Sequence, residues 1–471
     1  MLNRILDNDT NSALATPHGM GAIAVVRVSG PKALEIVASL FQQHGKPLET
    51  SEITSHKAYH GYLINNGEML DEVLVTFFRA PHSFTGEDSA EISVHGSVYV
   101  QQKLLQILIS HGCRMAEAGE FTRRAFVNRK FDLAQAEAIA DLISSESEAA
   151  HRVAINQLKG GFSKELQVMR SKLLEMTSLM ELELDFSEED VEFADRSQLK
   201  ALLDETLTHL NKLKDSFRLG NAIKNGIPVA IVGQTNTGKS TLLNALLGED
   251  RAIVSDIAGT TRDTIEETLN INGILYRFID TAGLRNTNET IEKIGIERSY
   301  KKIQEATLVI GMLDATKGAE NVLFAAKEIL EKIDLEHQQL ILCINKVDTL
   351  NDRGEALLGQ VRQDLDNDDI MVVCLSAKHG FGLGDLYNTL KLSQPLASPD
   401  ATLVTNVRHY EALLHASESL KSVQQGLEMN IPTDLVSQDL REALHYLGSI
   451  TGEITTDEIL GSIFSRFCIG K

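Results

Sequence analysis

The segment from Gly233 to Ser240 has the residue types and the spacing of a phosphate-binding loop, G-x-x-x-x-G-K-S. Its two glycines, at 233 and 238, allow the backbone to curl so that its N–H groups point at phosphate oxygens. We expect Lys239 to pair with the β- and γ-phosphates and Ser240 to ligate Mg²⁺. A strand pattern precedes the loop and a helix pattern follows it, which is the context that this motif requires. The segment therefore predicts a nucleoside triphosphate site.

Two later segments have side chains that would complete a magnesium site. Thr261 lies in a stretch with little regular pattern, and its hydroxyl can ligate Mg²⁺ when the γ-phosphate is present. A further strand pattern ends at Asp280, whose carboxylate would hold Mg²⁺ through water, and the N–H of Gly283 would contact the γ-phosphate. Hydroxyl and carboxylate oxygens are ligands that Mg²⁺ prefers, so both segments fit the site predicted at the loop.

The segment from Asn345 to Asp348 predicts that the base is guanine. The Asp348 carboxylate can accept hydrogen bonds from guanine N1–H and the 2-amino group. Adenine has neither donor, so a buried carboxylate would be left unpaired. Residues 376–378, Ser-Ala-Lys, can close over the base. Five matching segments in this order predict a GTP-binding domain.

The residue after Gly283 is Leu284, where many GTPases with a similar site have a glutamine that orients the attacking water. Leucine cannot hydrogen-bond water, so another polar group must do so. The nearby candidates, each of which could also be an ordinary surface charge, are Arg262, Arg285, Glu289 and Glu292. Asn236, within the loop, is either a cation ligand or a turn residue.

Composition restricts the class of protein. The chain has 471 residues and a formal net charge of −21, which disfavours non-specific coating of nucleic acid, although a local basic patch could still bind one RNA. None of the four cysteines forms a CxxC pair, so zinc and disulfide interpretations are weak. The sequence has no signal-peptide pattern and no apolar run long enough for a membrane span, so we expect a cytoplasmic protein without a membrane partner.

The pattern of elements predicts a multidomain α/β chain. The first part alternates strand and helix patterns as an α+β domain, a long helical pattern follows, and a second alternating region contains the phosphate loop before helix returns. We predict a discontinuous all-α helical domain interrupted by a P-loop GTPase domain of Ras-like α/β type. The expected boundaries are 1–127, 128–224, 225–390 and 391–471.

Five further segments are distinctive beyond the general GTPase motifs, namely 83–88 (SFTGED), 119–126 (GEFTRRAF), 133–143 (LAQAEAIADLI), 280–285 (DTAGLR) and the C-terminal FCIGK. Through these segments the chain resembles, from end to end, the tRNA-modification GTPase family MnmE, also called TrmE. The resemblance implies an enzyme that adds a carboxymethylaminomethyl or aminomethyl group at C5 of the wobble uridine of certain tRNAs. It also implies a homodimer that works with the flavoprotein MnmG in a heterotetramer.

The resemblance assigns further cofactors and residues. It implies a tetrahydrofolate derivative (the 5-formyl or 5,10-methylene form) bound by the N-terminal domain, which also dimerises. Matching folate positions are Arg27, Glu91, Lys130 and Lys471. Arginine and lysine can hold folate carboxylates, and a carboxylate can bind the pterin edge. GTP hydrolysis would be stimulated by K⁺ and by pairing of two GTPase domains. Matching K⁺ positions are Asn236, the carbonyls of Ser255 and Ile257, and Thr260.

The resemblance selects Glu292 as the water-positioning residue. It also favours a role for Cys468, because the family's C-terminal segment reaches the folate site. From the residues alone, a reactive thiol and an ordinary C-terminal cysteine are equally good interpretations. A capping box at 455–458 predicts a final helix over 459–467, directly before this cysteine.

The full nucleotide-binding set is Asn236, Thr237, Gly238, Lys239, Ser240, Thr241, Ser255, Asp256, Ile257, Ala258, Gly259, Thr260, Thr261, Asp280, Thr281, Ala282, Gly283, Asn345, Lys346, Val347, Asp348, Ser376, Ala377 and Lys378.

Two other functions compete with this one. A ribosome-assembly or regulatory GTPase switch of the Era or Der type would normally add a basic RNA-binding domain after the GTPase domain, whereas the C-terminal segment here is helical and not basic. A structural dimer module with an inert folate domain is the third hypothesis. Binding of a reduced folate separates it from the first.

Overall fold

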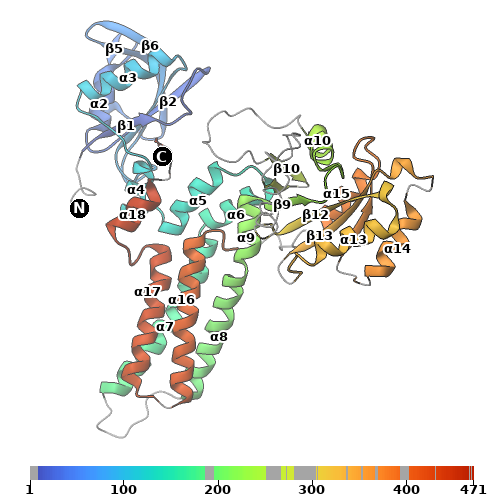
Figure 1. Cartoon of the computed structure of the whole chain (residues 1–471). Coiled ribbons are helices and arrows are strands. Elements are labelled where there is room, and N and C mark those ends of the chain that lie inside the picture. The colour runs from blue at the N-terminus through green and yellow to red at the C-terminus, as the bar shows by residue number, and fades with distance from the viewer. Residues whose placement is uncertain are drawn as a thin grey trace. The chain divides into compact units, whose positions relative to one another are not determined.

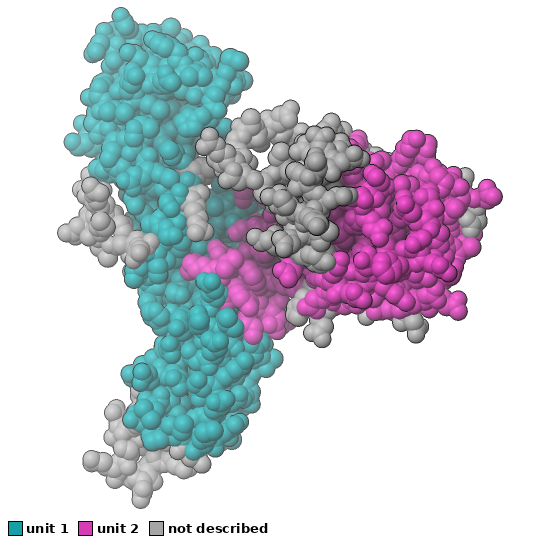
Figure 2. Space-filling view, viewed as in Figure 1, with its two compact units in different colours: residues 1–143, 155–211, 411–471 teal, residues 144–154, 212–410 magenta. Residues whose placement is uncertain are grey.

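The computed structural model describes residues 9–185, 196–250, 267–271, 273–279, 304, 306–335, 338–351, 354–365, 367, 370–392, 402–429, 431–465, 467 and 469–470. The chain forms two compact units, which Figure 2 colours separately. One comprises Met1–Ile143, Ile155–Asn211 and Glu411–Lys471, and the other Ser144–Ala154 and Lys212–Tyr410. The second unit is thus inserted in the sequence of the first, which confirms the interrupted architecture. The exact boundaries at 127, 224 and 390 stay predictions.

The N-terminal part of the first unit contains a mixed sheet with strand order β4-β3-β5-β6-β7-β2-β1-β8 among the described residues. Neighbouring strands are antiparallel except β1 and β8, which are parallel. The strands are β1 Asn11–Leu14, β2 Ile23–Ser29, β3 Phe41–Gln43, β4 Lys46–Pro47, β5 Lys57–Asn65, β6 Glu68–Phe78, β7 Ser89–His95 and β8 Arg114–Met115. The helices are α2 Ala33–Leu40, α3 Val98–Ser110 and α4 Glu120–Val127, with a 3-10 turn η1 at Thr50–Glu52.

Alternation along β2 gives this sheet two different faces. Ala24, Val26 and Val28 point into an apolar core that also contains residues of α2 and α3. Arg27 lies between two of these positions and therefore points to the opposite face, since successive strand residues alternate. That opposite face positions Arg27 and its register partner Glu91, two of the residues predicted to bind folate.

The remainder of the first unit is helical. Its helices are α5 Leu133–Ile143, α6 Glu148–Leu158, α7 Gly161–Asp185, α8 Arg196–Asp215, α16 Val407–Glu428, α17 Thr433–Thr451 and α18 Asp457–Phe464. Helices α6, α8 and α16 each have one end in the second unit. Helix α7 begins at Gly161, directly after Gly160, which has a positive φ of 80°. Figure 1 shows α7, α8, α16 and α17 side by side. Leu166, Met169 and Leu173 form a buried stripe along α7 at helical spacing, which packs against α17. Ser417 of α16 donates to Asn211 of α8 at 3.1 Å.

The final helix begins within the predicted capping segment 455–458, two residues before the predicted start at 459. The Thr456 hydroxyl accepts a hydrogen bond from the Ile459 N–H at 3.4 Å, and α18 starts at the next residue, Asp457. The predicted end at 467 is wrong, because α18 ends at Phe464. Beyond it, Ile469 forms an antiparallel β-bridge with Ala118, so the chain's C-terminal end returns to the N-terminal sheet.

The described residues of the second unit form a six-stranded sheet in the order β10-β11-β9-β12-β13-β14. Strands β11, β9, β12, β13 and β14 are parallel, and β10 is antiparallel at one edge. All seven residues of β12 are buried, as expected for a central strand covered on both faces. The strands are β9 Ile227–Val232, β10 Glu267–Ile271, β11 Ile274–Phe278, β12 Leu308–Asp314, β13 Gln339–Asn345 and β14 Met371–Cys374. The helices are α9 Phe217–Asn225, α10 Lys239–Asp250, α13 Ala319–Leu330, α14 Glu355–Leu365 and α15 Leu383–Leu392, with 3-10 turns η3 Ala315–Lys317 and η4 Val347–Thr349. Within the described part of the chain, the helices include none long and apolar enough to cross a membrane.

Candidate functional sites

The phosphate loop connects β9 to α10 and has the backbone geometry that its glycines predict. Gly233 and Gly238 have positive φ angles of 146° and 98°. A Cβ at Gly233 would lie 2.4 Å from the Met312 carbonyl oxygen, and a Cβ at Gly238 would lie 2.3 Å from the Asn345 side-chain nitrogen. Both positions therefore need glycine for conformation and for space. Asn236 also has a positive φ, 62°, which asparagine tolerates better than most residues.

The Lys239 ammonium group folds back over the loop. Its Nζ donates to the carbonyl oxygens of Gly233 at 2.8 Å and Gln234 at 2.7 Å. The Thr237 hydroxyl donates to the same Gln234 carbonyl at 2.9 Å. These contacts hold the loop as a curled segment with a cation above it. Ser240 follows in the first turn of α10, where a hydroxyl can ligate a metal ion beside bound phosphate.

Asn345, at the end of β13, connects two of the predicted motifs. Its side-chain nitrogen donates to the Thr237 carbonyl at 2.8 Å, and its side-chain oxygen accepts from the Ala377 N–H at 2.9 Å. The residue is 3% exposed, so these hydrogen bonds are shielded from water. Asn345 thus fixes the phosphate loop relative to the segment that follows β14.

The predicted base-binding carboxylate lies at the same edge of the sheet. Asp348 belongs to η4, directly after β13, and His379 Nε2 lies 3.7 Å from its carboxylate. The pKa of Asp348 is lowered, first by the Ser376 hydroxyl and also by the charges of His379 and Lys378, against a smaller opposing effect of burial. Asp348 is therefore ionised near neutral pH, as an acceptor for two guanine donors must be.

Several predicted residues lie outside the described part of the chain. They are Ser255, Asp256, Ile257, Ala258, Gly259, Thr260, Thr261, Asp280, Thr281, Ala282, Gly283, Glu292, Cys468 and Lys471. The described nucleotide-site residues lie at or just after the carboxyl ends of β9, β13 and β14; they are Asn236 to Thr241, Asn345 to Asp348 and Ser376 to Lys378. This edge is where parallel α/β sheets bind ligands.

The second predicted site lies on the N-terminal sheet, on the face opposite the apolar core. Arg27 of β2 and Glu91 of β7 are register partners, and Arg27 donates to the Glu91 carboxylate at 2.8 and 3.0 Å. The Arg27 guanidinium lies 4.7 Å from the ring centre of Phe84 and 5.5 Å from that of Phe121. Both distances are within the range of cation–π attraction. The pair thus offers a cation and a carboxylate between aromatic rings, which fits a charged, ring-containing ligand.

Sequence reasoning did not assign Phe84 and Phe121 to this site. Both lie in segments that carried the family resemblance, at 83–88 and 119–126, and that placement was the available signal. Lys130, which was assigned, donates from Nζ to the Pro81 carbonyl at 3.0 Å. Its side chain therefore rests against the loop before β7 that carries Phe84.

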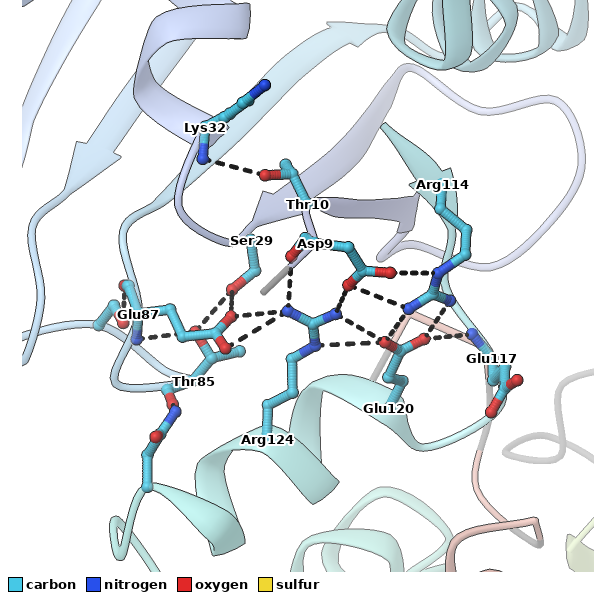
Figure 3. Close-up of polar contacts among 12 residues, drawn as sticks. Asp9, Thr10, Ser29, Lys32, Thr85, Glu87, Arg114, Glu117, Glu120 and Arg124 are labelled. Carbon is cyan, nitrogen blue, oxygen red and sulfur yellow. Dashed lines mark hydrogen bonds and ion pairs between the residues drawn. The ribbon is translucent and has the colours of Figure 1, made fainter. Parts of the chain in front are cut away.

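An ionic network with a buried centre, Arg124 and Glu120, holds that loop and α4 together (Figure 3). Arg124 of α4 donates to Glu87 at 3.1 Å, to Asp9 at 2.5 Å and to Glu120 at 2.9 Å. Arg114 of β8 donates to Asp9 and Glu120 from the other side. Burial by itself raises the pKa of Glu120. Hydrogen bonds from Arg114, from the Glu117 N–H and from Arg124 outweigh burial and lower the pKa to about 2. The network fixes the helix that bears Phe121 and the loop that bears Phe84.

The chain's C-terminal end lies against the same domain. Ile469 is bridged to Ala118, and a Cβ at Gly470 would lie 2.1 Å from the Leu14 carbonyl oxygen. Phe464 and Phe467 pack in one apolar cluster with Leu133. The described residues on both sides of Cys468 therefore belong to the first unit and contact it.

A parallel sheet with a glycine loop after β9, an asparagine connector after β13 and an ionised carboxylate in η4 defines a phosphate-loop GTPase. Residues 133–468 match the family model described as the MnmE helical domain, and residues 10–130 match that of the GTP-binding protein TrmE N-terminus. The chain is 50% identical to the tRNA modification GTPase MnmE of Bacteroides fragilis, covering 99% of this chain and 100% of that protein. The MnmE of Flavobacterium johnsoniae is also 50% identical, with the same coverage. The chain belongs to the MnmE family of tRNA modification GTPases.

Family membership makes this chain a GTP-hydrolysing enzyme that takes part in tRNA modification. Among solved structures, it is similar to Aquifex aeolicus Era bound to GDP.AlF4⁻, with 28% identity, 41% of this chain and 66% of that chain covered, and a TM-score of 0.28. A TM-score this low adds nothing to the assignment, which is based on the sheet, the site and the full-length relatives.

Proposed function

We propose that this enzyme adds a carboxymethylaminomethyl or aminomethyl group at C5 of wobble uridine in certain tRNAs, together with the flavoprotein MnmG. GTP hydrolysis in the second unit would drive a reaction whose one-carbon donor binds the N-terminal domain. The observation that carries this proposal is the Arg27–Glu91 pair between Phe84 and Phe121, because a GTPase that acts only as a switch needs no such second ligand site.

The most direct experiment measures the modified nucleoside. Mass spectrometry of tRNA from cells that lack this chain is expected to find unmodified C5 at the wobble uridine, restored by the wild-type gene. Unchanged wobble uridines would contradict the proposal and favour a ribosome-assembly or regulatory switch of the Era or Der type.

The one-carbon donor would be a 5-formyl- or 5,10-methylene-tetrahydrofolate. Arg27 and Lys130 supply cations for its carboxylates, Glu91 can accept from the pterin edge, and the two phenylalanine rings can pack against the pterin. Titration calorimetry of the full chain with 5-formyltetrahydrofolate is expected to give at least about tenfold weaker binding for Arg27→Ala, because a charge-assisted contact is lost.

Arg79→Ala is the matched control for this titration. Arg79 is an exposed arginine of the same domain, and it donates to the Thr50 carbonyl at 2.9 Å. Its loss should leave folate binding unchanged. Equal binding by both variants and the wild type would remove Arg27 from the site.

We propose Mg²⁺ and K⁺ as the metal ions of the nucleotide site. Mg²⁺ would be held by Ser240 and Thr261. K⁺ would be held by Asn236, by Thr260 and by the carbonyls of Ser255 and Ile257, and there it would offset negative charge that develops on the phosphates. Asn236 supports this proposal because its side chain is exposed and lies on the loop predicted to surround the phosphates.

Salt exchange tests the K⁺ assignment. GTP turnover is expected to be much slower in Na⁺ than in K⁺, and Asn236→Ala should remove most of that difference. Equal rates of the wild type in both salts would leave Asn236 as a turn residue only.

Glu292→Ala should abolish turnover while GTP still binds, because a water-positioning residue acts only in hydrolysis.

The proposed homodimer would cover an exposed face of the N-terminal sheet. Tyr62, Leu74 and Ile23 are 38%, 49% and 67% exposed. The register pairs Leu74 with Ser93, two residues from Glu91, and therefore places these side chains on the same face as Arg27 and Glu91. Large exposed apolar side chains on one sheet face favour an interface.

Light scattering after gel filtration tests this interface. Leu74→Glu is expected to give monomers at concentrations where the wild type is dimeric, because it would bury a charge. Leu174→Glu is the matched control, since Leu174 of α7 is also 49% exposed. If both variants remain dimeric, the second copy binds elsewhere.

A further inference from the structure

The carboxyl end of β12 has a functional position that the sequence motifs do not cover. In the sheet, β12 lies between β9, which leads into the phosphate loop, and β13, which leads into the base-binding segment. Its last residue, Asp314, is the register partner of Asn345. Asp314 therefore lies at the ligand-binding edge, between the two halves of the nucleotide site.

Both carboxylate oxygens of Asp314 are used. One accepts a hydrogen bond from Lys346 Nζ at 2.7 Å. The other accepts from the N–H and the hydroxyl of Thr316, at 3.0 and 2.6 Å. The Asp314 side chain is 8% exposed, whereas that of Lys346 is 35% exposed. Burial raises the pKa of Asp314, but the hydrogen bonds from Lys346 and Thr316 outweigh burial and lower it. The carboxylate is therefore ionised and fixed, and it faces the lysine.

The backbone conformation, the neighbours and the flexible side chain of Lys346 explain why it needs a fixed partner. It has a positive φ of 67°, which is uncommon for a residue with a side chain. It lies between Asn345, which fixes the phosphate loop, and Asp348, the proposed acceptor for guanine. A lysine side chain has four rotatable bonds, and ordering it on binding costs affinity unless it is ordered beforehand.

We infer that Asp314 is a positioning residue for guanine nucleotide binding, which holds Lys346 in its binding orientation before the nucleotide arrives. Asp314 itself would touch no nucleotide atom. The inference rests on the proposed role of Lys346 in the nucleotide site. A purely structural alternative exists, because Asp314 also caps η3 through Thr316.

A double-mutant cycle in the full-length protein separates the two roles. Asp314→Asn keeps an oxygen that can cap η3 but removes the charge that fixes Lys346. It is expected to weaken binding of fluorescently labelled GTP by about tenfold, and to raise KM similarly while kcat changes less than about twofold. In a Lys346→Met background, the same substitution should change affinity by less than about twofold, because Asp314 then has no lysine to position.

Three further variants complete the experiment. Thr316→Val removes a donor to the same carboxylate and leaves the lysine contact, so GTP affinity should stay at the wild-type value. Asp314→Glu restores a carboxylate and should recover part of the affinity. If the asparagine variant does not fold, Asp314→Ser, which also caps without a charge, replaces it with the same expectation.

The outcomes are distinct. Wild-type affinity of Asp314→Asn, or additive losses in the cycle, would overturn this inference and leave the proposed nucleotide site intact. Wild-type affinity of Lys346→Met would overturn the role of Lys346 and with it this inference. Weakened binding of both single variants with no further loss in the double variant would support it.

Discussion

The nucleotide site lies at the ends of neighbouring parallel strands, whereas the N-terminal site lies on the face of a mainly antiparallel sheet. The first uses backbone groups and short motifs, such as the segment from Gly233 to Ser240. The second uses side chains from separate elements, with Arg27 and Glu91 on two strands, Phe84 in a loop and Phe121 on α4. A phosphate is large and symmetric and can be bound by backbone N–H groups, but a charged ring system needs several side chains in fixed positions.

The contacts that hold the two sites in place also differ. Asn345 connects the phosphate loop to the segment after β14 with two hydrogen bonds. The N-terminal site depends on the network around Arg124, in which three carboxylates surround one guanidinium (Figure 3). The comparison predicts that damage to the nucleotide loop affects binding directly, whereas damage to the network affects stability first.

The largest effect is expected at Gly238. In Gly238→Ala, the new Cβ would lie 2.3 Å from the Asn345 side-chain nitrogen at a φ of 98°. GTP affinity should fall roughly 100-fold or more, because the substitution strains the loop and displaces its connector. Gly248→Ala in α10 is the control, since nothing lies within 4 Å of a Cβ there. Similar affinities of both variants in a fluorescence titration would show that the loop tolerates a side chain.

The next effect is expected in the N-terminal network. Arg124→Met should destabilise the first unit by about 3 kcal/mol, because it removes one of the two guanidinium groups paired with Glu120, which is 1% exposed, and the guanidinium that Asp9 and Glu87 share. GTP affinity should change little. The measurement is urea denaturation followed by amide exchange in α4.

Arg152→Met in α6 provides the contrast, with amide exchange followed in α6, because this part of the helix belongs to the second unit. The Arg152–Glu148 pair is exposed, with side chains 54% and 75% accessible, and its loss should cost less than about 0.5 kcal/mol. Equal losses from the two arginines would mean that burial does not strengthen the network.

Acid should destabilise the same network by protonating Glu120. Its pKa is lowered from 4.5 to about 2 in the folded chain, so its carboxylate stabilises the fold above about pH 4.5. That contribution is lost as pH falls from about 4.5 towards 2, because the unfolded chain binds the proton first. Unfolding free energies measured between about pH 6 and pH 3 should fall less steeply for Glu120→Gln. Parallel curves would contradict the assignment.

The smallest effect is expected at the cap of α18. Thr456→Ala removes the hydroxyl that accepts from the Ile459 N–H and should cost about 1 kcal/mol of local stability. Faster amide exchange confined to α18 is the expected result. Thr455→Ala, at the preceding hydroxyl, should leave exchange there unchanged.

Sequence reasoning succeeded where a feature depends on neighbouring residues. It predicted the curled loop after β9 and the interrupted architecture, because each has a pattern in the sequence. The guanine-selective role of residues 345–348 stays a prediction. Sequence reasoning gave no role to Asp314, which is an ordinary aspartate at a strand end until β12 is placed between β9 and β13. It also assigned no role to Arg124, whose partners Asp9 and Glu87 are 115 and 37 residues away.

The sequence by itself determined what the nucleotide loop is, because glycine spacing, a lysine and a hydroxyl act within one turn of chain. Only the tertiary structure decided which distant side chains meet: Lys346 with Asp314, Arg27 with two aromatic rings, and Arg124 with three carboxylates. Charged groups interact strongly only where the surrounding fold excludes water, and the fold that excludes water is built from residues far apart in sequence.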